Sequence, residues 1–280
     1  MTQPLLSRET VLDLVPFGAA DSRTVFYALR LSLPKWGEWH AGQFVMLRTA
    51  KPLPDVLWGR PFSLCLVTRR DLVLFFQVAG RATAGLARLA AGDQVVIWGP
   101  LGNAMAMEAH VPTLLLAGGI GIVPFVGYVH THPTPWDLSM EFGYRKPLSC
   151  YPFDNINEKI PVDPHQEKDP ADRDAFLALL DSRIREYSSS GLVLACGPAP
   201  FLRAVQSFAL KHKTRTQLCL ETRMACGVGA CLGCMVRATV PQDPALARSV
   251  PQRAHCADHS ARLVQTCLCG PNFWANSVLF

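Results

Sequence analysis

The stretch Thr113–Pro124, TLLLAGGIGIVP, decides how this chain is expected to fold. It begins as the apolar run Thr113–Ala117, turns at closely spaced glycines and continues into a second apolar segment. This pattern is typical of a buried strand that leads through a tight turn into a helix. The uncharged segment Val111–Val129 approaches the length of a membrane span, but its glycines and prolines favour the strand, turn and helix, so we expect no membrane segment.

Strands and helices are predicted to alternate downstream of this stretch. Apolar runs predict strands at Leu138–Phe142 and Leu192–Cys196, and helices are predicted near Ala171–Tyr187 and Pro200–Leu210. The intervening Cys150–Pro170 is rich in Asp, Asn, Glu and Pro, and is expected to be an exposed loop. The alternation predicts a Rossmann-like α/β domain.

The first hundred residues follow a different pattern, in which short strands are separated by turn residues. Strands are predicted at Thr24–Leu33, Gln43–Arg48, Leu72–Val78 and Gln94–Trp98, with one helix near Thr83–Ala90. Strands at this spacing favour a small antiparallel β-barrel. The predicted fold class is therefore α+β multidomain, with a barrel domain over 1–108, an α/β domain over 109–214 and a small cysteine-rich domain over 215–280.

The cysteine-rich segment contains the run Met224–Cys234, MACGVGACLGC. Its cysteines have the spacing C-x4-C-x2-C, with which plant-type ferredoxins hold a [2Fe–2S] cluster. The glycines between them let the backbone curve closely and direct N–H groups at the sulfurs. We therefore predict a cluster held by Cys226, Cys231 and Cys234. The fourth ligand is left open among Cys256, Cys267 and Cys269.

A zinc site is the main alternative for these cysteines, and plain free thiols are a second. Cys231, Cys234, Cys267 and Cys269 have the number and type of side chains that close a tetrahedral zinc site. Zinc would leave Cys226 unused, however, and neither the x4 gap nor the glycine density is typical of a zinc loop. The pattern favours iron and sulfur.

Composition indicates the expected cellular compartment and gives no support for some classes of partner. The chain has 280 residues, of which 49% are apolar and 18% charged, with a formal charge of +5 that gives no case for nucleic-acid binding. The N-terminal residues lack the apolar core of an export signal. The 10 cysteines are therefore expected to be reduced thiols of a cytoplasmic protein.

Two motifs in the barrel segment are suited to phosphate. Arg60-Pro61-Phe62-Ser63 offers a guanidinium and a hydroxyl for charge-assisted hydrogen bonds. The strand residues Phe75-Phe76-Gln77 precede the turn Gly80-Arg81-Ala82-Thr83, whose amides are predicted to open a helix and to suit a pyrophosphate. An ordinary strand, turn and helix remains the alternative for each motif taken alone.

Two further motifs follow the predicted parallel strands. The glycines Gly118, Gly119 and Gly121 form a phosphate-approach turn that departs from G-x-G-x-x-G because residue 124 is proline. Cys196-Gly197-Pro198 ends a second strand at the edge where open α/β sheets bind ligands. The alternatives are a tight connection without a ligand and a small buried thiol.

The order of these motifs resembles the ferredoxin-reductase-like flavoproteins. It resembles most closely the electron transfer subunits of type B dihydroorotate dehydrogenase. The resemblance runs from about Gly42 to the C-terminus. Its most specific parts are LETRMACGVGACLGCMV, over 220–236, and the ending Cys267-Leu268-Cys269-Gly270-Pro271.

The resemblance implies cofactors, ligands and a partner. FAD would contact Arg60–Ser63, Phe75–Gln77, Ala82 and Thr83, and Cys267 would complete the set that holds the cluster. NAD(H) would bind the α/β domain as co-substrate, with Cys196 facing the nicotinamide. FAD would then exchange a hydride with NAD and pass electrons singly through the cluster. The partner would be an FMN-containing catalytic subunit that oxidises dihydroorotate to orotate in pyrimidine biosynthesis, with two copies of each subunit in the complex.

The chain departs from the family pattern in three places. Ala82 stands where the family usually has glycine, and Cys269 stands where it has aspartate. The span before Cys267 is long, which predicts an inserted loop such as Pro241–Ser260.

Other functions share this order of motifs. One alternative is a related NAD(P)H reductase module that serves ferredoxin, a hydrogenase or a sulfur reductase. Another is a non-catalytic redox or zinc sensor. The choice between NADH and NADPH is also open, since Arg145 and Lys146 suit either a 2′-phosphate or solvent.

Overall fold

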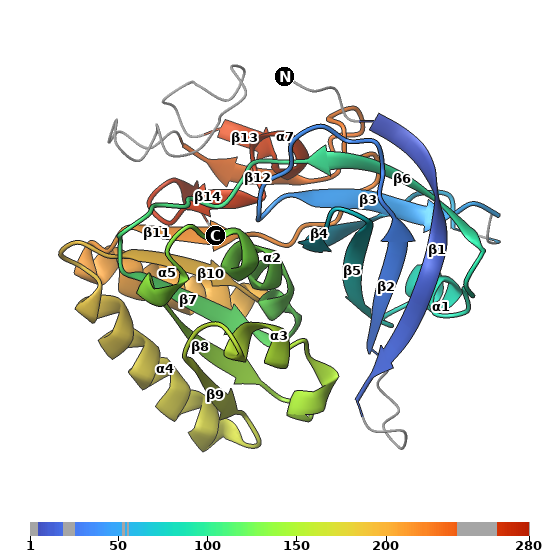
Figure 1. Ribbon diagram of the computed structural model, residues 1–280. Helices are drawn as coiled ribbons and strands as arrows, with labels where there is room; N and C mark the ends of the chain where they lie inside the picture. The colour runs from blue at the N-terminus through green and yellow to red at the C-terminus, as the bar shows by residue number, and fades with distance from the viewer. Residues whose placement is uncertain (1–4, 19–25, 52–53, 55, 240–261, 280) are drawn as a thin grey trace.

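A computed structural model describes residues 5–18, 26–51, 54, 56–239 and 262–279. In Figure 1 a β-barrel lies beside a layered α/β unit, and the C-terminal strands lie across both. The predicted combination of an antiparallel barrel, an α/β sheet and a small C-terminal unit is confirmed. Cys256 and the predicted insertion Pro241–Ser260 fall outside the described residues.

The barrel is closed and entirely antiparallel. Its strands follow the order β1-β2-β5-β4-β3-β6, and β6 pairs with β1. Leucine, valine and phenylalanine side chains from alternate positions fill the interior, as expected for a small barrel. Helix α1 covers one end. The bounds are β1 Leu5–Phe17, β2 Phe26–Ser32, β3 Phe44–Thr49, β4 Arg60–Val67, β5 Asp71–Gln77, α1 Arg81–Leu86 and β6 Gln94–Leu101.

The second unit is a six-stranded sheet in the order β14-β11-β10-β7-β8-β9. Five strands are parallel, and β14 joins the edge in the antiparallel direction. Their bounds are β7 Thr113–Gly118, β8 Leu138–Tyr144, β9 Val162–Gln166, β10 Leu192–Cys196, β11 Thr216–Cys219 and β14 Asn272–Trp274.

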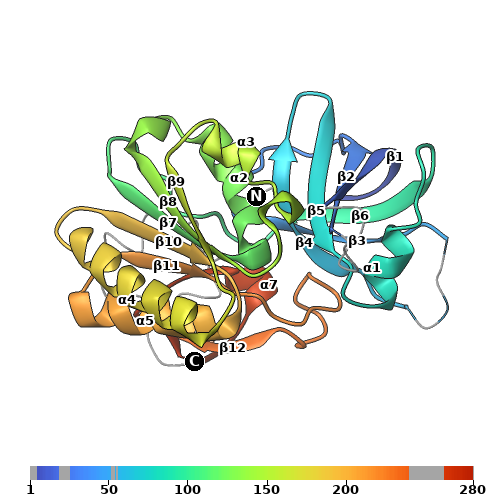
Figure 2. The same cartoon turned by 90° about the horizontal axis from the view of Figure 1, so that it is seen from below.

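Helices cover both faces of this sheet (Figure 2). Helices α4 and α5 pack on the outer face, and α2 and α3 lie on the face towards the barrel. The bounds are η1 Gly119–Ile122, α2 Val123–Thr131, η2 Pro135–Asp137, η3 Leu148–Cys150, α3 Asp154–Asn157, α4 Pro170–Glu186 and α5 Ala199–His212. No helix in the described part of the chain is long and apolar enough to cross a membrane.

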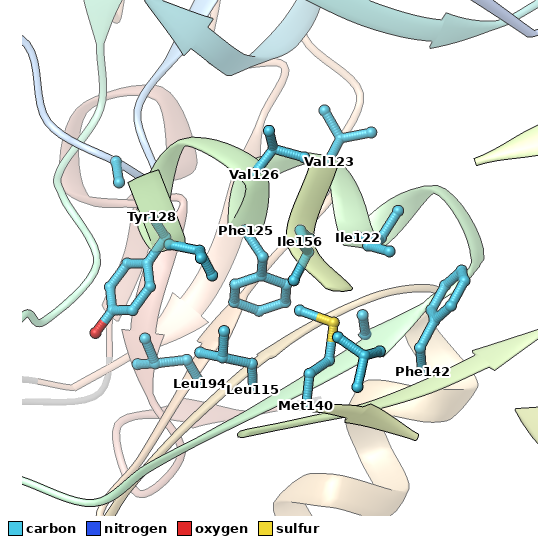
Figure 3. Packing of buried hydrophobic residues seen from close by; sticks show 14 of the residues in the cluster. Leu115, Ile122, Val123, Phe125, Val126, Tyr128, Met140, Phe142, Ile156 and Leu194 are labelled. Carbon is cyan, nitrogen blue, oxygen red and sulfur yellow. The ribbon is translucent and has the colours of Figure 1, made fainter. Parts of the chain in front are cut away.

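Helix α2 joins the two units because it is apolar on every side. Figure 3 shows Phe125 of this helix pointing at Leu115 and Met140 of the sheet. On the opposite side Gly127 lies so close to β4 that an added Cβ would be 2.9 Å from the carbonyl oxygen of Cys65. A helix that is apolar all round is stable only where it is buried on all sides. The barrel and the sheet therefore share one core.

The C-terminal segment forms a three-stranded antiparallel sheet in the order β13-β12-β15. Its bounds are β12 Met235–Ala238, β13 Arg262–Gln265 and β15 Val278–Leu279, with the short helix α7 Thr266–Cys269 between β13 and β14. Because β11 and β14 are the last two strands at one edge of the large sheet, the segment after residue 215 is joined to the α/β unit there. The boundaries 1–108, 109–214 and 215–280 stay a prediction.

The predicted exposed loop over Cys150–Pro170 is wrong. This segment contains α3 and β9, and Cys150, Tyr151 and Ile156 are buried in the shared core. Several of its polar residues occupy the exposed positions of α3 and β9, between buried aromatic and aliphatic side chains, so composition alone was misleading. The helix predicted near Thr83–Ala90 begins earlier and ends sooner, as α1, and β1 was not predicted.

A buried carboxylate closes the β4–β5 hairpin. Asp71 begins β5 and accepts hydrogen bonds from the hydroxyl of Thr68 and from the guanidinium of Arg30. These bonds, first that from Thr68 and then those from Arg30, lower the pKa of Asp71 below its ordinary value of 3.8.

We predict that Asp71→Asn lowers the free energy of unfolding by about 1–2 kcal/mol at pH 7, because charge-assisted hydrogen bonds become neutral ones. Since the pKa of Asp71 is lowered on folding, its contribution is complete above pH 3.8 and is lost as the pH falls below that value. Urea unfolding at pH 7 and below pH 3.8 measures the difference in unfolding free energy between the wild type and Asp71→Asn, which should shrink at the lower pH. Asp163→Asn, at an exposed position, is the control, and an equal change in both variants would contradict the prediction.

Candidate functional site

The cysteine run forms a loop between β11 and β12 in which the sulfurs come in pairs. Cys226 and Cys231 form the first pair, and their thiols are hydrogen-bonded to each other. The backbone N–H groups of Val228 and Cys231 also donate to the Cys226 sulfur, each over 3.4 Å. Burial raises the pKa of Cys226, but these donors outweigh it and bring the pKa down to about 7. The loop therefore favours a thiolate at this position.

Cys234 and Cys267 form the second pair, at the buried end of the loop. Helix α7 brings Cys267 to the loop, and the backbone N–H of Thr266 donates to the carbonyl oxygen of Cys234 over 2.9 Å. Both cysteines are buried, and their thiols are hydrogen-bonded. Burial, followed by the bond to Cys234, raises the pKa of Cys267 to about 12. Metal binding would have to displace that proton.

Three of the predicted ligands and Cys267 are thus brought together, while Cys269 is not free to join them. Cys269 is engaged in a disulfide, so the expectation that the cysteines are all reduced thiols is wrong for this residue. The zinc alternative needed Cys269 as a fourth thiolate, and the disulfide removes it. Among the described residues, no three His, Cys, Asp or Glu side chains are arranged to hold a single metal ion.

The backbone of the loop fits a bulky inorganic group. Gly227 and Gly229 have φ angles of +71° and +86°, which favour glycine. A Cβ on Gly227 would lie 2.5 Å from the Cγ atom of Met46, and one on Gly229 would lie 2.6 Å from a methyl carbon of Leu268. The glycines let the loop close against the barrel on one side and against α7 on the other. With two thiol pairs and inward N–H groups, the donor set suits a two-iron cluster.

The barrel residues predicted to contact FAD divide between surface and core. Arg60 is exposed at the start of β4 and donates to the carbonyl oxygens of Trp58 and Gly59, while Pro61 and Ser63 are half-buried. Phe62 and Phe76 point into the barrel core, and Phe75 lies in the core shared with the α/β unit. Gln77, at the end of β5, is half-buried.

A small hollow lies beside Trp58, whose carbonyl oxygen accepts a hydrogen bond from Arg60. It is lined by apolar and polar side chains from β3, α1 and the segment before β4: Leu47, Arg48, Thr49, Val56, Trp58, Ala82 and Leu86. Trp58 is 54% exposed, which leaves a large ring free to stack. Thr83 is used by its own helix, since its hydroxyl oxygen accepts from the N–H groups of Ala79 and Gly80.

The glycine turn and the Cys196 motif meet at the carboxyl edge of the sheet. A Cβ on Gly121 would overlap the carbonyl group of Cys196, so the two turns touch through their backbones. Gly119, with a φ of +55°, has open space where a Cβ would point. The two motifs therefore lie on neighbouring strands, as Rossmann-like binding requires.

Cys219 was not predicted as part of this edge. It lies opposite Cys196 in the pairing of β10 with β11, and the two thiols are hydrogen-bonded. This bond, together with burial, raises the pKa of Cys196, so that its thiol stays protonated. Strand register would have been needed to find the pair from sequence.

Contacts of the barrel segment with the cysteine loop and with β14 were also not predicted. The indole N–H of Trp98, on β6, donates to the carbonyl oxygen of Cys226 over 2.9 Å. Asn103, after β6, donates to the carbonyl oxygen of Asn272 over 2.8 Å and accepts from its N–H over 3.0 Å. These residues are far apart in the chain, and no local motif marks them.

Comparison with known proteins agrees with this geometry. Residues 221–250 match the iron–sulfur cluster binding domain of dihydroorotate dehydrogenase B. The electron transfer subunit of the NAD(+)-dependent dihydroorotate dehydrogenase B of Clostridium perfringens is 30% identical, over 71% of this chain and 78% of the relative. The corresponding subunit of Caldanaerobacter subterraneus is 29% identical, over 86% of this chain and 87% of the relative.

Solved structures share the fold. A chain of an NADH-dependent reduced ferredoxin-NADP oxidoreductase superposes with a TM-score of 0.72 at 19% identity, covering 96% of this chain and 89% of its own length. Ferredoxin-NADP+ reductase from Plasmodium falciparum gives a TM-score of 0.60 at 12% identity, over 73% of this chain and 89% of its own. The fold is that of the ferredoxin-reductase-like proteins. The chain belongs to the family of dihydroorotate dehydrogenase B electron transfer subunits.

The fourth ligand gives the sharpest prediction for this site. Cys267→Ser is expected to abolish most iron binding, because it leaves Cys234 without its paired thiol. Cys269→Ser is expected to keep the iron, because Cys269 is held in a disulfide. Iron and acid-labile sulfide per chain, measured after anaerobic reconstitution, check this. Iron loss confined to Cys269→Ser would contradict it.

Proposed function

We propose that this chain passes electrons between an FMN-containing catalytic dihydroorotate dehydrogenase subunit and NAD, using FAD on the barrel and a [2Fe–2S] cluster on the cysteine loop, in pyrimidine biosynthesis. The observation that carries the proposal is the packing of the paired cysteines against the barrel end that also bears Arg60. Cys234 and Cys267 form an apolar cluster with Phe44 and Met46 of β3. A flavin site and a cluster site thus share one wall.

The cofactors supply the redox chemistry: FAD, when bound, exchanges a hydride with NAD(H), and the cluster carries electrons one at a time. The complete reaction with the partner balances as dihydroorotate and NAD+ giving orotate, NADH and a proton. The chain's part is to hold both groups in one rigid frame. It also tunes the cluster, through the N–H groups of Val228 and Cys231 that point at the Cys226 sulfur.

Each cofactor has a proposed set of residues. Cys226, Cys231, Cys234 and Cys267 hold the cluster. Arg60 and Ser63 meet the FAD phosphates or ring oxygens, and the backbone of Phe75–Gln77 and of Ala82–Thr83 lines the rest of the cofactor. The side chains of Phe62 and Phe76 support this surface from inside the barrel. The functional segments proposed are 1–108 for FAD, 109–214 for NAD and 215–280 for the cluster.

From the order of strands in the sheet we propose the direction in which NAD(H) binds across it. Phosphates at the turn Gly118–Gly121 and a nicotinamide beside Cys196 place the dinucleotide along β7 and β10. Its adenosine then extends the other way, over the carboxyl ends of β8 and β9, since neighbouring strands are only about 4.8 Å apart. Arg145 and Glu167 are among the side chains that follow these strands, together with the exposed Lys146.

These two side chains support NADH over NADPH. Arg145 donates from Nε and Nη2 to the two carboxylate oxygens of Glu167, over 3.0 and 2.8 Å. A guanidinium held in such a fork is not free for a 2′-phosphate, and the carboxylate would repel one. A ribose 2′-hydroxyl, in contrast, can donate to that carboxylate.

The partner is proposed to meet the rim of the cysteine loop. Cys231 is exposed there, and the flanking Val228 and Leu232 are 47% and 62% exposed. An apolar rim around a redox centre suits a stable protein interface. Two copies of each subunit and a cytoplasmic location complete the proposal. Reductase modules for ferredoxin, a hydrogenase or a sulfur reductase are less well supported, because the ferredoxin-NADP reductase structures share only 12–19% identity, against 29–30% for the dihydroorotate dehydrogenase B relatives.

Reconstitution tests the proposed function. The chain, loaded with FAD and the cluster, is mixed anaerobically with a dihydroorotate dehydrogenase B catalytic subunit, and NADH is followed at 340 nm on addition of dihydroorotate and NAD+. We expect NADH formation that requires both subunits. A mixture that oxidises dihydroorotate with an artificial dye but forms no NADH would contradict the assignment.

Glu167→Gln is predicted to relax nucleotide specificity. It frees the Arg145 guanidinium and removes the repelling carboxylate, so the ratio of NADPH to NADH efficiency in flavin reduction should rise by roughly tenfold. The control is Asp174→Asn, which breaks the exposed ion pair of Asp174 with Arg173 on α4. If the ratio of NADPH to NADH efficiency is unchanged in Glu167→Gln, the adenosine does not bind beside Glu167 and the prediction is wrong.

A further inference from the structure

Trp98 is the side chain that ties the first cluster ligand to the barrel. It lies in the middle of β6, pairs with Met46 of β3 and is half-buried against the apolar cluster that contains Cys234 and Cys267. Its indole N–H donates to the carbonyl oxygen of Cys226 over 2.9 Å. The bond fixes the backbone of the ligand itself.

The adjacent benzene edge of the same ring touches the flavin motif. A Cβ on Gly59 would lie 2.5 Å from Cη2 of Trp98 and 3.2 Å from Cζ2, so the ring rests on the Gly59 backbone. Gly59 immediately precedes Arg60. One rigid ring therefore contacts the chain at the start of the flavin motif and the chain at the first cysteine of the loop.

We propose that Trp98 is a positioning residue that sets the separation and orientation between the flavin motif and the cluster-ligand loop. The inference rests on the proposed function. The loop is rich in glycine, and Gly227 and Gly229 have φ angles open to few other residues, so its own backbone provides little stiffness. A tryptophan has only two side-chain torsions and loses little entropy when it is fixed, which makes it an effective spacer.

Gln265 provides a matched comparison on the other side of the loop. Its side-chain N–H donates to the carbonyl oxygen of Gly229 over 2.6 Å. Like Trp98 it anchors a loop carbonyl, but it comes from β13 of the same C-terminal segment. Loss of Gln265 should loosen the loop without changing the contact to the flavin motif.

The test compares Trp98→Phe with Gln265→Met in the full chain loaded with FAD and cluster. After rapid anaerobic mixing with NADH, flavin and iron–sulfur absorption are followed separately. The reduced cluster is also examined by electron paramagnetic resonance, and hydrogen exchange of 226–234 is measured without NADH. We expect Trp98→Phe to reduce its flavin at the wild-type rate and its cluster about tenfold more slowly, with faster exchange around Cys226. In Gln265→Met the ratio of the two rates should stay at the wild-type value.

Two results would overturn the proposal: cluster reduction in Trp98→Phe at the wild-type rate, or equal slowing in both variants, which would make Trp98 one loop anchor among several. If Trp98→Phe does not retain its cluster, Gly59→Ala replaces it, since it keeps the indole N–H and displaces the ring. Wild-type cluster reduction in Gly59→Ala also overturns the proposal. The proposed function can fail separately. If NADH reduces the flavin and the cluster of the wild-type chain, but the chain forms no NADH from dihydroorotate with the catalytic subunit, the proposed function is contradicted and the role of Trp98 is not.

Discussion

The apolar contact between the end of the barrel and the cysteine loop is the constraint on which the rest of this structure depends. Met46 lies where a Cβ on Gly227 would go, so the loop follows the barrel surface only because that position is glycine. The same contact buries Cys234 and Cys267 and leaves Cys231 exposed at the rim. A cluster at this loop would therefore lie close to the barrel on its buried side and be accessible to a partner protein on its exposed side. Both contacts are needed to carry electrons from one redox centre to the next.

A second set of contacts, between the start of β14 and the barrel segment, stabilises this arrangement. Asn272 begins β14, at the edge of the large sheet, and its side-chain amide donates to the carbonyl oxygens of Gly42 and Asn103. The chain thus returns from α7 to the barrel before it joins the sheet beside β11. Helix α2 completes the frame from the other face. The barrel, the α/β sheet and the C-terminal strands are held together by buried contacts, so they are expected to move as one body.

The sequence predicted those features that depend on local spacing. Apolar periodicity located β10 and α4, and cysteine spacing identified three sulfurs of the loop. Features that depend on long-range register were missed: Trp98 and Cys226 are 128 residues apart, and Asn103 and Asn272 are 169 apart. The choice of Cys267 over Cys269 came from family resemblance, and the disulfide of Cys269 supports it. Cys150–Pro170 was misread because its polar residues mask buried Tyr151 and Ile156.

The central claim is that this chain alone joins a flavin to an iron–sulfur cluster. An anaerobic ultraviolet–visible spectrum of the purified chain, with iron, sulfide, zinc and flavin quantified on the same sample, tests it most directly. We expect flavin bands together with broad iron–sulfur absorption, both bleached by NADH. Zinc without flavin, or flavin that NADH bleaches while the iron–sulfur absorption stays unchanged, would contradict it.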